Sequence, residues 1–153
     1  YEDSAKIPAL IAGPGIKKGR KIGRPAMDVD MTATIIDMAD AKRGRTMDGI
    51  SLLPALRGKK KLPQRDLPLE AMRPLFVFYT PITAFDLPYY GVRTDRYKYI
   101  HWSFDTNNVE LYDLKKDPDE LDNLANDPAY AATVAKLEAE ATRLRSCRGN
   151  TCR

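Results

Sequence analysis

Residues 89–114 read YYGVRTDRYKYIHWSFDTNNVELYDL, and this stretch decides the fold of the C-terminal half of the chain. Aromatic and β-branched residues, which favour strands, stand on both sides of a polar segment at residues 94–96. The pattern predicts a hairpin with strands at Tyr89–Arg93 and Tyr97–Trp102. A further short strand is expected at residues 110–114. Together these strands predict a small antiparallel sheet.

C-terminal to these strands, the sequence carries two helix-start signals. Asp117 can act as a cap, Pro118 suits the first helical position and Glu120 follows three residues after the cap, so a helix is expected to begin there. The Asp-Pro pair at residues 127–128 repeats the signal. An apolar stripe at helical spacing then extends to about residue 145, formed by Val134, Leu137, Ala141 and Leu144. We expect this C-terminal helix to pack on the sheet.

The segment before the hairpin reads differently. Residues 7–12, IPALIA, form an apolar run ended by Gly-Pro-Gly, which predicts a strand covered on both faces, as in a parallel sheet. If residues before position 1 supply that cover, the strand is expected to be unpaired here or to pair with another chain. A helix is expected at residues 31–39 with Asp30 as its N-cap, and a short one at 51–56 with Gly58 as its stop.

These elements together predict an α/β architecture for the 153 residues. Residues 1–65 are expected to hold a last strand and helices of a larger α/β domain. Residues 66–153 are expected to form a smaller lobe, an antiparallel sheet packed on a C-terminal helix. Within that lobe the run LFVFY at residues 75–79 predicts another strand, and residues 57–69 are interpreted as a connection.

Charge is distributed unevenly along the chain. Residues 1–65 contain 14 Lys and Arg against 7 Asp and Glu, whereas residues 66–153 contain 11 against 14. The excess is concentrated in two runs, KKGRK at residues 17–21 and RGKKK at residues 57–61. Such runs suit solvated loops. The alternative is a surface that attracts a polyanion such as a sulfated polysaccharide or nucleic acid, of which nucleic acid is the weaker candidate because no aromatic residues interleave.

The two cysteines, Cys147 and Cys152, lie close together near the end of the chain. Two thiolates are too few for a metal site, and the only histidine, His101, is distant in sequence. The Gly149-Asn150 pair between the cysteines is typical of turns, so a short disulfide loop is predicted. Such a disulfide implies an oxidising compartment. No apolar run approaches the roughly 20 residues that span a bilayer, so no membrane association is expected.

Self-sufficient catalytic patterns are not evident in the sequence. No serine lies in a G-x-S-x-G pattern, and no phosphate-binding or dinucleotide-binding glycine loop occurs. A Ser-His-Asp set would depend on His101, which falls inside a predicted strand. We therefore expect the isolated chain to lack an active site.

Six segments, in order, resemble stretches of type I sulfatases of the alkaline-phosphatase-like superfamily. They cover nearly the whole chain: YEDSAKIP at 1–8, AGPGI at 12–16, DMTATIIDMA at 30–39, MDGISLLP at 47–54, GVRTDRYKYI at 91–100 and ELYDLKKDPDELDNL at 110–124. Two departures are Ala33, where the family has Pro, and Lys6, where it has Arg. Lys6 cannot form the bidentate contacts of an arginine.

The resemblance implies that the parent protein hydrolyses sulfate esters, possibly of sugars. Similar enzymes use a formylglycine made from a Cys or Ser in a C/S-x-P-S/A-R motif, together with a calcium ion held by Asp and Asn side chains. Cys147 lies in CRGNT and does not fit that motif. By resemblance the nucleophile and the metal ligands precede Tyr1, so this chain is expected to contain neither and to require an N-terminal catalytic part as its partner.

In this family the C-terminal lobe packs beside the catalytic cleft and helps to select the substrate. His101, Trp102 and Arg93 are the candidates for contact with a sulfated small molecule or saccharide. For His101 the alternative is a structural hydrogen bond within the sheet, and for Arg93 it is burial beside carboxylates. A secreted or periplasmic location is expected. Two other functions stay open: a non-catalytic binding domain that kept this fold, and a fragment of a phosphonate or phosphate hydrolase.

Overall fold

The computed structural model describes residues 2–71, 88–103 and 108–152. The chain forms two compact units. The first unit comprises Tyr1–Ala5 and Asp66–Ser146, and the second comprises Lys6–Arg65 and Cys147–Arg153. Among the described residues, every helix is too short or too polar to span a lipid bilayer.

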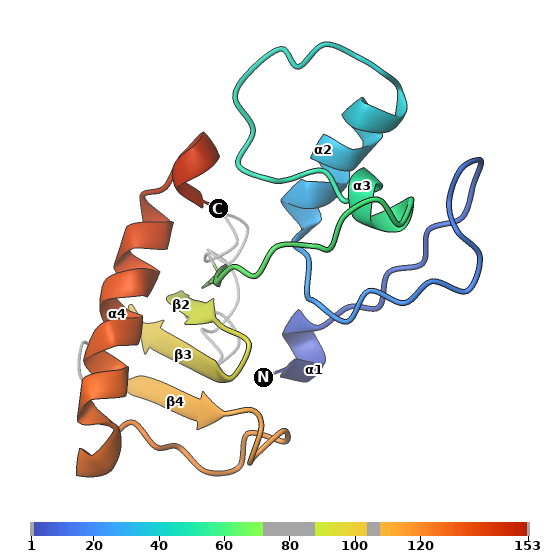
Figure 1. Cartoon of the computed structure of the whole chain (residues 1–153). Coiled ribbons are helices and arrows are strands. Elements are labelled where there is room, and N and C mark those ends of the chain that lie inside the picture. The colour runs from blue at the N-terminus through green and yellow to red at the C-terminus, as the bar shows by residue number, and fades with distance from the viewer. Residues whose placement is uncertain (1, 72–87, 104–107, 153) are drawn as a thin grey trace, which may run out of the picture. The chain divides into compact units, whose positions relative to one another are not determined.

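The first unit is built on a four-stranded antiparallel sheet in the order β1-β2-β3-β4 (Figure 1). Its strands are β1 (Leu67–Ala71), β2 (Tyr89–Arg93), β3 (Tyr97–Trp102) and β4 (Val109–Asp113). The hairpin is confirmed residue for residue, since Arg93 lies opposite Lys98 and Tyr89 lies opposite Trp102. The strand expected at 110–114 is β4, shifted by one residue.

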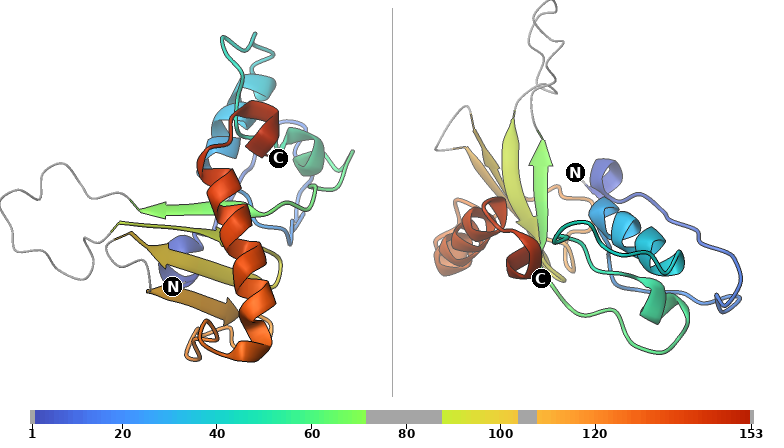
Figure 2. Two further views of the ribbon diagram at one scale, coloured as in Figure 1. Left: turned by 90° about the vertical axis from the view of Figure 1, so that its left-hand side faces the viewer. Right: turned by 90° about the horizontal axis from the view of Figure 1, so that it is seen from above.

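Helix α4 (Ala131–Arg145) covers one face of the sheet, as predicted (Figure 2). It begins after a single 3-10 turn at Pro128–Tyr130, where the Asp127 carboxylate accepts a hydrogen bond from the Ala129 amide at 2.9 Å. Period-two alternation places one set of strand residues toward the helix. The buried apolar core of this unit includes Val92, Tyr99 and Leu111 from the sheet and Leu137, Ala141 and Leu144 from the helix.

The segment between the second unit and the hairpin differs from its predicted structure. Residues 67–69, predicted as the end of a connection, instead begin strand β1 (Leu67–Ala71), which tolerates Pro68 because an edge strand need not use every backbone donor. The strand expected at residues 75–79 lies outside the described residues.

The helix expected to begin at Asp117 is absent, and this prediction is wrong. The Asp117 carboxylate instead accepts hydrogen bonds from the Leu121 and Asp122 amides, which closes a loop in place of a helical turn. Glu120 adopts a left-handed backbone conformation, with φ of 56°, and its side chain is buried. The loop therefore directs a carboxylate into the unit where a helix would have exposed it.

The second unit contains helices α2 (Asp28–Met38) and α3 (Leu53–Leu56). Asp30 was expected to be the N-cap, but it lies in the first turn of α2 and Met27 is the N-cap. The Asp30 carboxylate accepts a hydrogen bond from the Met27 amide at 2.8 Å. A small core joins the helices to the flanking loops, and it consists of Leu52, Ala55 and Leu62 with Ile22, Met31, Ile50 and Leu56 packed against them. Gly58 follows α3 with φ of 75°, in agreement with its predicted role as a helix stop.

The strand expected at residues 7–12 is not formed. The short helix α1 (Glu2–Ala5) precedes this segment, which has no regular structure of its own. Ile7 and Leu10 expose 82% and 99% of their surface. A strand is stabilised by hydrogen bonds to its neighbours, and the described residues provide none for this segment. Whether another chain segment covers it stays a prediction, as does the assignment of residues 1–65 to a larger catalytic domain.

Candidate functional site

A buried ion cluster lies at one end of the sheet in the first unit. The Lys98 ammonium, on β3, is 2.6 Å from the Glu120 carboxylate and 3.4 Å from that of Glu2, and the Lys98 and Glu120 side chains are 2% and 1% exposed. Arg93 on β2 completes the cluster at 3.3 Å from Glu2. Burial alone would raise the pKa of Glu2, but Arg93 and Lys98 together lower it below its ordinary value. The cluster is charge-balanced, which indicates a structural role.

Arg93, one of the predicted substrate contacts, is therefore occupied by protein partners. Its guanidinium also donates a hydrogen bond to the Thr94 carbonyl. Because Arg93 ends β2 while Trp102 ends β3 at the opposite end of the hairpin, the structure does not bring these two candidates together.

His101 lies on the face of the sheet that α4 covers. Its ring stacks on Tyr90 with centroids 4.8 Å apart, and Nδ1 is 3.4 Å from the Tyr99 hydroxyl and 3.9 Å from Glu138 on α4. Burial raises the pKa of Tyr99, so this hydroxyl stays protonated at neutral pH. These contacts describe a side chain integrated into the sheet–helix interface.

Trp102 lies on the opposite face of the sheet. Its indole Nε1 donates a hydrogen bond to Glu110 at 2.9 Å, and its ring meets Tyr89 edge-on with centroids 5.3 Å apart. The three predicted contacts therefore occupy three separate places in the first unit.

A pocket of about 310 Å³, here called the sheet-end pocket, lies at the end of the sheet that carries Trp102. Its polar and aromatic lining combines a carboxylate, hydroxyls and a guanidinium, in a set made up of Glu70, Ala71, Pro88, Tyr89, Tyr90, Ser103 and Arg145. The Arg145 guanidinium, at the end of α4, lies 4.6 Å from the centre of the Tyr90 ring. This combination suits a ligand with both hydroxyl and anionic groups.

The predicted contact Trp102 lies beside the sheet-end pocket through Tyr89 but does not line it, and the sequence did not predict that Ser103 and Arg145 line a pocket. The pocket depends on Arg145 at the end of α4, which returns to the sheet 52 residues after the last residue of β2 (145 − 93). No local pattern encodes that meeting.

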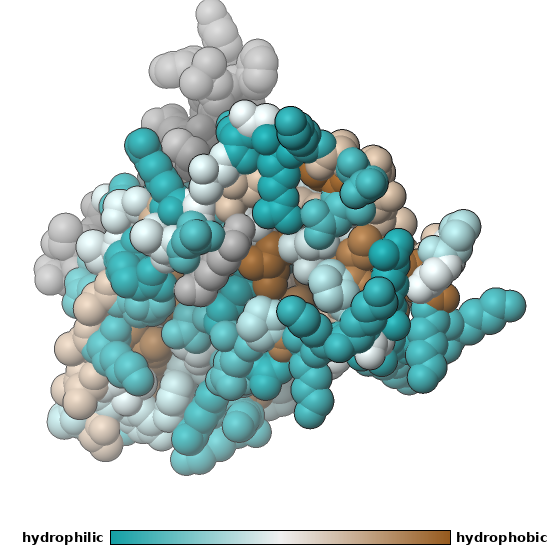
Figure 3. Space-filling view, turned by 45° about the horizontal axis from the view of Figure 1, so that its top comes forward, coloured by the Kyte–Doolittle hydropathy of each residue, from teal (hydrophilic) through white to brown (hydrophobic). Residues whose placement is uncertain are grey.

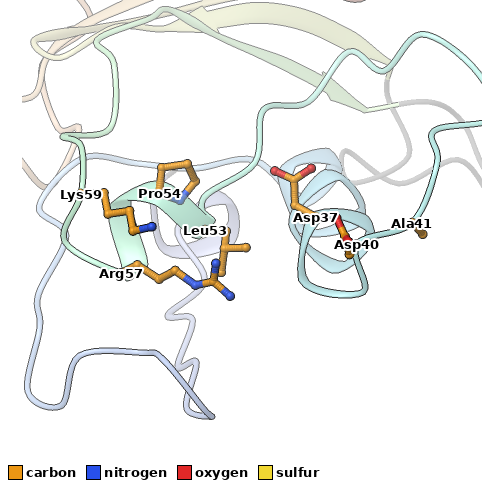
Figure 4. Close-up of a pocket in the computed structure, with 7 residues that line it drawn as sticks. All are labelled: Asp37, Asp40, Ala41, Leu53, Pro54, Arg57 and Lys59. Carbon is orange, nitrogen blue, oxygen red and sulfur yellow. The ribbon is translucent and has the colours of Figure 1, made fainter.

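The second unit contains another pocket, of about 300 Å³, between the end of α2 and the region of α3 (Figure 4). Asp37 and Asp40 line one side, and Arg57 and Lys59 line the other. Hydrogen bonds from Ser51 and Arg43 lower the pKa of Asp37, and the Arg43 guanidinium lies 3.0 Å from its carboxylate.

Asp30 organises the interior of the second unit. Its carboxylate accepts hydrogen bonds from the Met27 and Ile50 amides, each at 2.8 Å, and forms an ion pair with the buried Arg65. The backbone at Gly49 passes so close to α2 that an added Cβ would lie 2.3 Å from the Val29 carbonyl oxygen. The fully used carboxylate of Asp30 indicates a structural centre.

Cys147 and Cys152 form a disulfide with their Cα atoms 5.1 Å apart. Both sulfurs are thus unavailable for conversion to a nucleophile. The part of the chain that the structure describes contains no group of three or more His, Cys, Asp or Glu placed to hold a metal ion.

Comparison with known proteins places these features in a family. The family model for the C-terminal region of N-sulphoglucosamine sulphohydrolase matches residues 1–147. A Delta 4,5-hexuronate-2-O-sulfatase from Bacteroides thetaiotaomicron is 35% identical over 144 residues, which is 91% of this chain and 28% of that protein. The chain thus spans little more than a quarter of the length of this curated relative.

Solved structures agree. A protein described as a putative sulfatase from Bacteroides thetaiotaomicron superposes with a TM-score of 0.70 at 34% identity, over 87% of this chain and 28% of that one. A phosphonate monoester hydrolase from Agrobacterium radiobacter superposes with a TM-score of 0.58 at 25% identity, over 76% and 24%. Because the family match covers residues 1–147 and a putative sulfatase superposes on 87% of the chain, this chain belongs to the sulfatase family, as a C-terminal portion of a type I sulfatase.

Proposed function

We propose that this chain is the C-terminal part of an enzyme that hydrolyses sulfate esters of sugars. The observation that carries the proposal is the family match over residues 1–147. The relative from Bacteroides thetaiotaomicron is named as a sulfatase of a hexuronate, which is a sugar acid. Sugar sulfates present both hydroxyls and a fixed negative charge, and the sheet-end pocket offers partners for both.

In this proposal the chain contributes structure and pocket walls, and the chemistry is performed elsewhere in the protein. No Cys or Ser of the sequence stands in a C/S-x-P-S/A-R motif, both cysteines are in a disulfide, and the described residues contain no group of three or more His, Cys, Asp or Glu placed to hold a metal ion. The proposal therefore assigns the formylglycine and the calcium ion to a catalytic part outside these residues.

The segment at residues 7–12 is the proposed contact with that catalytic part. Leu10 and Ile7 are both largely exposed and present apolar surface to water in the described chain. Burying apolar surface contributes about 25 cal/mol per Å². If residues 7–12 joined the edge of a partner sheet as a strand, burial of their side chains and hydrogen bonds of their backbone would both stabilise the contact.

Within the first unit, the proposed substrate wall is the sheet-end pocket together with Trp102. Trp102 packs on Tyr89, and the next residue, Ser103, lines the pocket. Aromatic faces suit the apolar faces of sugar rings, and the Arg145 guanidinium suits an anionic substituent. We assign Arg93 and His101 structural roles in their ion cluster and stacked pair.

The proposed location is secreted or periplasmic. The Cys147–Cys152 disulfide supports it, because disulfides persist in oxidising compartments. A competing function is hydrolysis of phosphonate or phosphate esters, which the similarity to the Agrobacterium phosphonate monoester hydrolase favours.

The gene sequence upstream of the Tyr1 codon tests the proposal. A Cys or Ser in a C/S-x-P-S/A-R motif is expected, and an intact reading frame without it would contradict the sulfatase assignment. The encoded protein is then assayed with calcium on an aryl sulfate, a sulfated hexuronate and an aryl phosphonate monoester. Preferred turnover of the sulfates is the expected result, and preferred turnover of the phosphonate would support the competing function.

The 153-residue chain alone provides a second test. We expect no release of phenol from an aryl sulfate, with or without calcium, because the described residues contain no nucleophile set. A rate that depends on the protein and disappears when a residue of this chain is substituted would show that the chemistry is located here after all.

A further inference from the structure

Two basic runs that are distant in sequence lie against each other in the second unit. A methyl group added at Gly58 would lie 3.3 Å from Nη1 of Arg20, and one added at Gly15 would lie 3.6 Å from Nε of Arg57. Arg20 of the first run thus lies beside the backbone of the second run, and Arg57 of the second lies beside Gly15, two residues before the first run. We call the resulting patch the basic surface, and it consists of Lys17, Lys18, Arg20, Lys21, Arg57, Lys59, Lys60 and Lys61.

Both runs are anchored in one small core. Ile22, which follows the first run, and Leu62, which follows the second, pack in the cluster formed with Leu52 and Ala55. The left-handed backbone at Gly19, with φ of 67°, turns the chain within the first run. The lysines are therefore presented from two loops that share one apolar base, which keeps the two groups of charges together.

The basic surface carries more positive charge than its neighbours offset, because Asp37 and Asp40, which line a pocket together with Arg57 and Lys59, are two carboxylates beside eight cations. All eight side chains belong to exposed residues, and within the described part of the chain none of them takes part in an ion pair. No Asp or Glu occurs at residues 4–27 or 49–65. Figure 3 shows hydrophilic side chains over most of one face of the molecule, with small apolar areas between them. A surface rich in lysine and arginine, such as the basic surface, attracts anions over a distance of about one Debye length, roughly 8–10 Å at ordinary salt.

The composition of the second unit narrows the class of polyanion. Residues 6–65 and 147–153 contain no Phe, Tyr or Trp. Binding of single-stranded nucleic acid uses aromatic platforms on which bases stack, and insertion into a membrane surface uses large apolar or aromatic side chains beside the basic ones. The basic surface offers only flexible point charges, six of them lysines, which suit sulfate groups repeated along a polymer.

We propose that the basic surface is a docking site for a sulfated polysaccharide, separate from the site of hydrolysis. The basic surface binds several sulfate groups of one polysaccharide at once, and these need not include the sulfate group that is hydrolysed. The choice of a sulfated polymer over other polyanions rests on the proposed sulfatase function, whereas the existence of a polyanion site does not. Binding can be measured without turnover, so failure of one proposal is distinguishable from failure of the other.

The test compares three triple variants of the full 153-residue chain. One replaces Lys17, Lys18 and Lys21 by Gln, and another replaces Lys59, Lys60 and Lys61 by Gln. The matched control replaces Lys115, Lys116 and Lys136, which are exposed lysines of the first unit, by Gln. All three lose the same net charge, and circular dichroism verifies that each keeps its fold.

Affinity for heparin is measured by calorimetry at low salt and again at higher salt. Each basic-surface variant is expected to bind roughly tenfold more weakly, as the loss of a few exposed ionic contacts implies, and the control within about twofold of the unsubstituted chain. A similar loss from either run would show that both contribute to one site. Equal losses in the control would show that only net charge matters, and no binding of heparin by the unsubstituted chain would likewise overturn the proposal.

Three further probes identify the ligand class. Chemically desulfated heparin is expected to bind much more weakly, because it loses the groups that the lysines are proposed to contact. A DNA duplex of matched charge, or vesicles containing anionic lipid, that bound as tightly as heparin would contradict the assignment to a sulfated polysaccharide.

Discussion

The two units of this chain are stabilised in different ways. The first unit buries large side chains, among them Tyr99 and Leu111, between a regular sheet and a 15-residue helix, and it pairs its buried charges. The second has short helices, long loops and no aromatic residue, and it depends on hydrogen bonds that the Asp30 carboxylate and the Thr34 hydroxyl accept from backbone amides, together with one disulfide. The first unit should therefore tolerate the loss of a surface contact, whereas the second depends on a few polar centres.

The largest expected effect is on the first unit, from Lys98→Ala. This change leaves the Glu120 carboxylate buried without its cation, and breaking a buried ion pair costs about 3–5 kcal/mol. Urea unfolding followed by the fluorescence of Trp102, the only tryptophan, reports the free energy of unfolding of this unit. Lys115→Ala, at an exposed site, is the control. A loss below about 1 kcal/mol would mean that the cluster is solvated and contributes little.

The next effect is on the second unit, from Thr34→Val. The Thr34 hydroxyl donates to the Asp30 carbonyl at 2.7 Å and accepts from the Leu52 amide at 2.9 Å, and the residue is 1% exposed. Leaving a buried amide without a partner costs about 1–3 kcal/mol. Hydrogen exchange at Leu52 measures the effect, and Thr34→Ser, which keeps the hydroxyl, should retain protection. Unchanged exchange at Leu52 in the valine variant would show that this bond does not hold the loop to α2.

The same contrast explains which parts of the fold could be predicted from sequence. Two elements were predictable, the hairpin at Tyr89–Arg93 and Tyr97–Trp102 and the apolar stripe on α4. Strands and helices are indicated by the types and spacing of side chains that are close together in sequence. The loop around Glu120 was not predictable, because the local helix signal was outweighed by long-range partners of the Glu120 carboxylate, the Lys98 ammonium and the Glu2 amide. The segment at residues 7–12 has strand-like composition but no neighbour to pair with among the described residues.

The candidate site was predictable only in part. Trp102 is predictable as a candidate from its residue type near a strand end, but the sheet-end pocket beside it is lined by residues that include Arg145, which α4 brings back from a distant position in the chain. His101 and Arg93 were proposed as substrate contacts from residue type alone, and the structure places each among protein partners. Side-chain chemistry can be predicted from sequence, whereas the assembly of a pocket depends on tertiary contacts.

A smaller effect is expected when the disulfide is reduced. The loop that it closes is short, so the chain-entropy model gives a contribution of only about 2 kcal/mol, confined to the second unit. Intact mass should rise by about two hydrogens on reduction, as one disulfide opens to two thiols. Exchange at Gly149, whose amide donates to Asp48 at 2.6 Å, should accelerate while Trp102 fluorescence is unchanged. Two free thiols in the freshly secreted protein would contradict the assignment to an oxidising compartment.

The smallest effect concerns acid stability and compares one carboxylate from each unit. Hydrogen bonds from the Arg96 guanidinium lower the pKa of Asp113 below its ordinary value of 3.8, in the first unit. Ser51 and Arg43 lower the pKa of Asp37 in the second unit. A carboxyl whose folded pKa is depressed stabilises the fold fully above its unfolded pKa, and this contribution is lost as pH falls through the folded value.

Both contributions should therefore be present at neutral pH and disappear on acidification below about pH 4, near the ordinary carboxyl value. Asp113→Asn is expected to cost up to about 1 kcal/mol at pH 7, because Arg96 is 42% exposed and solvent screens the pair. The variant should also show a weaker loss of stability of the first unit on acidification, since it has no proton to gain at this position.

The substitution Asp37→Asn should change the free energy of unfolding less, because the Asp37 and Arg43 side chains are 33% and 41% exposed while that of Asp113 is 1% exposed. Urea unfolding of both variants at pH 7 and pH 3 measures the comparison. An equal or larger pH dependence at Asp37 would show that burial of the carboxylate is not what distinguishes the charges of the two units.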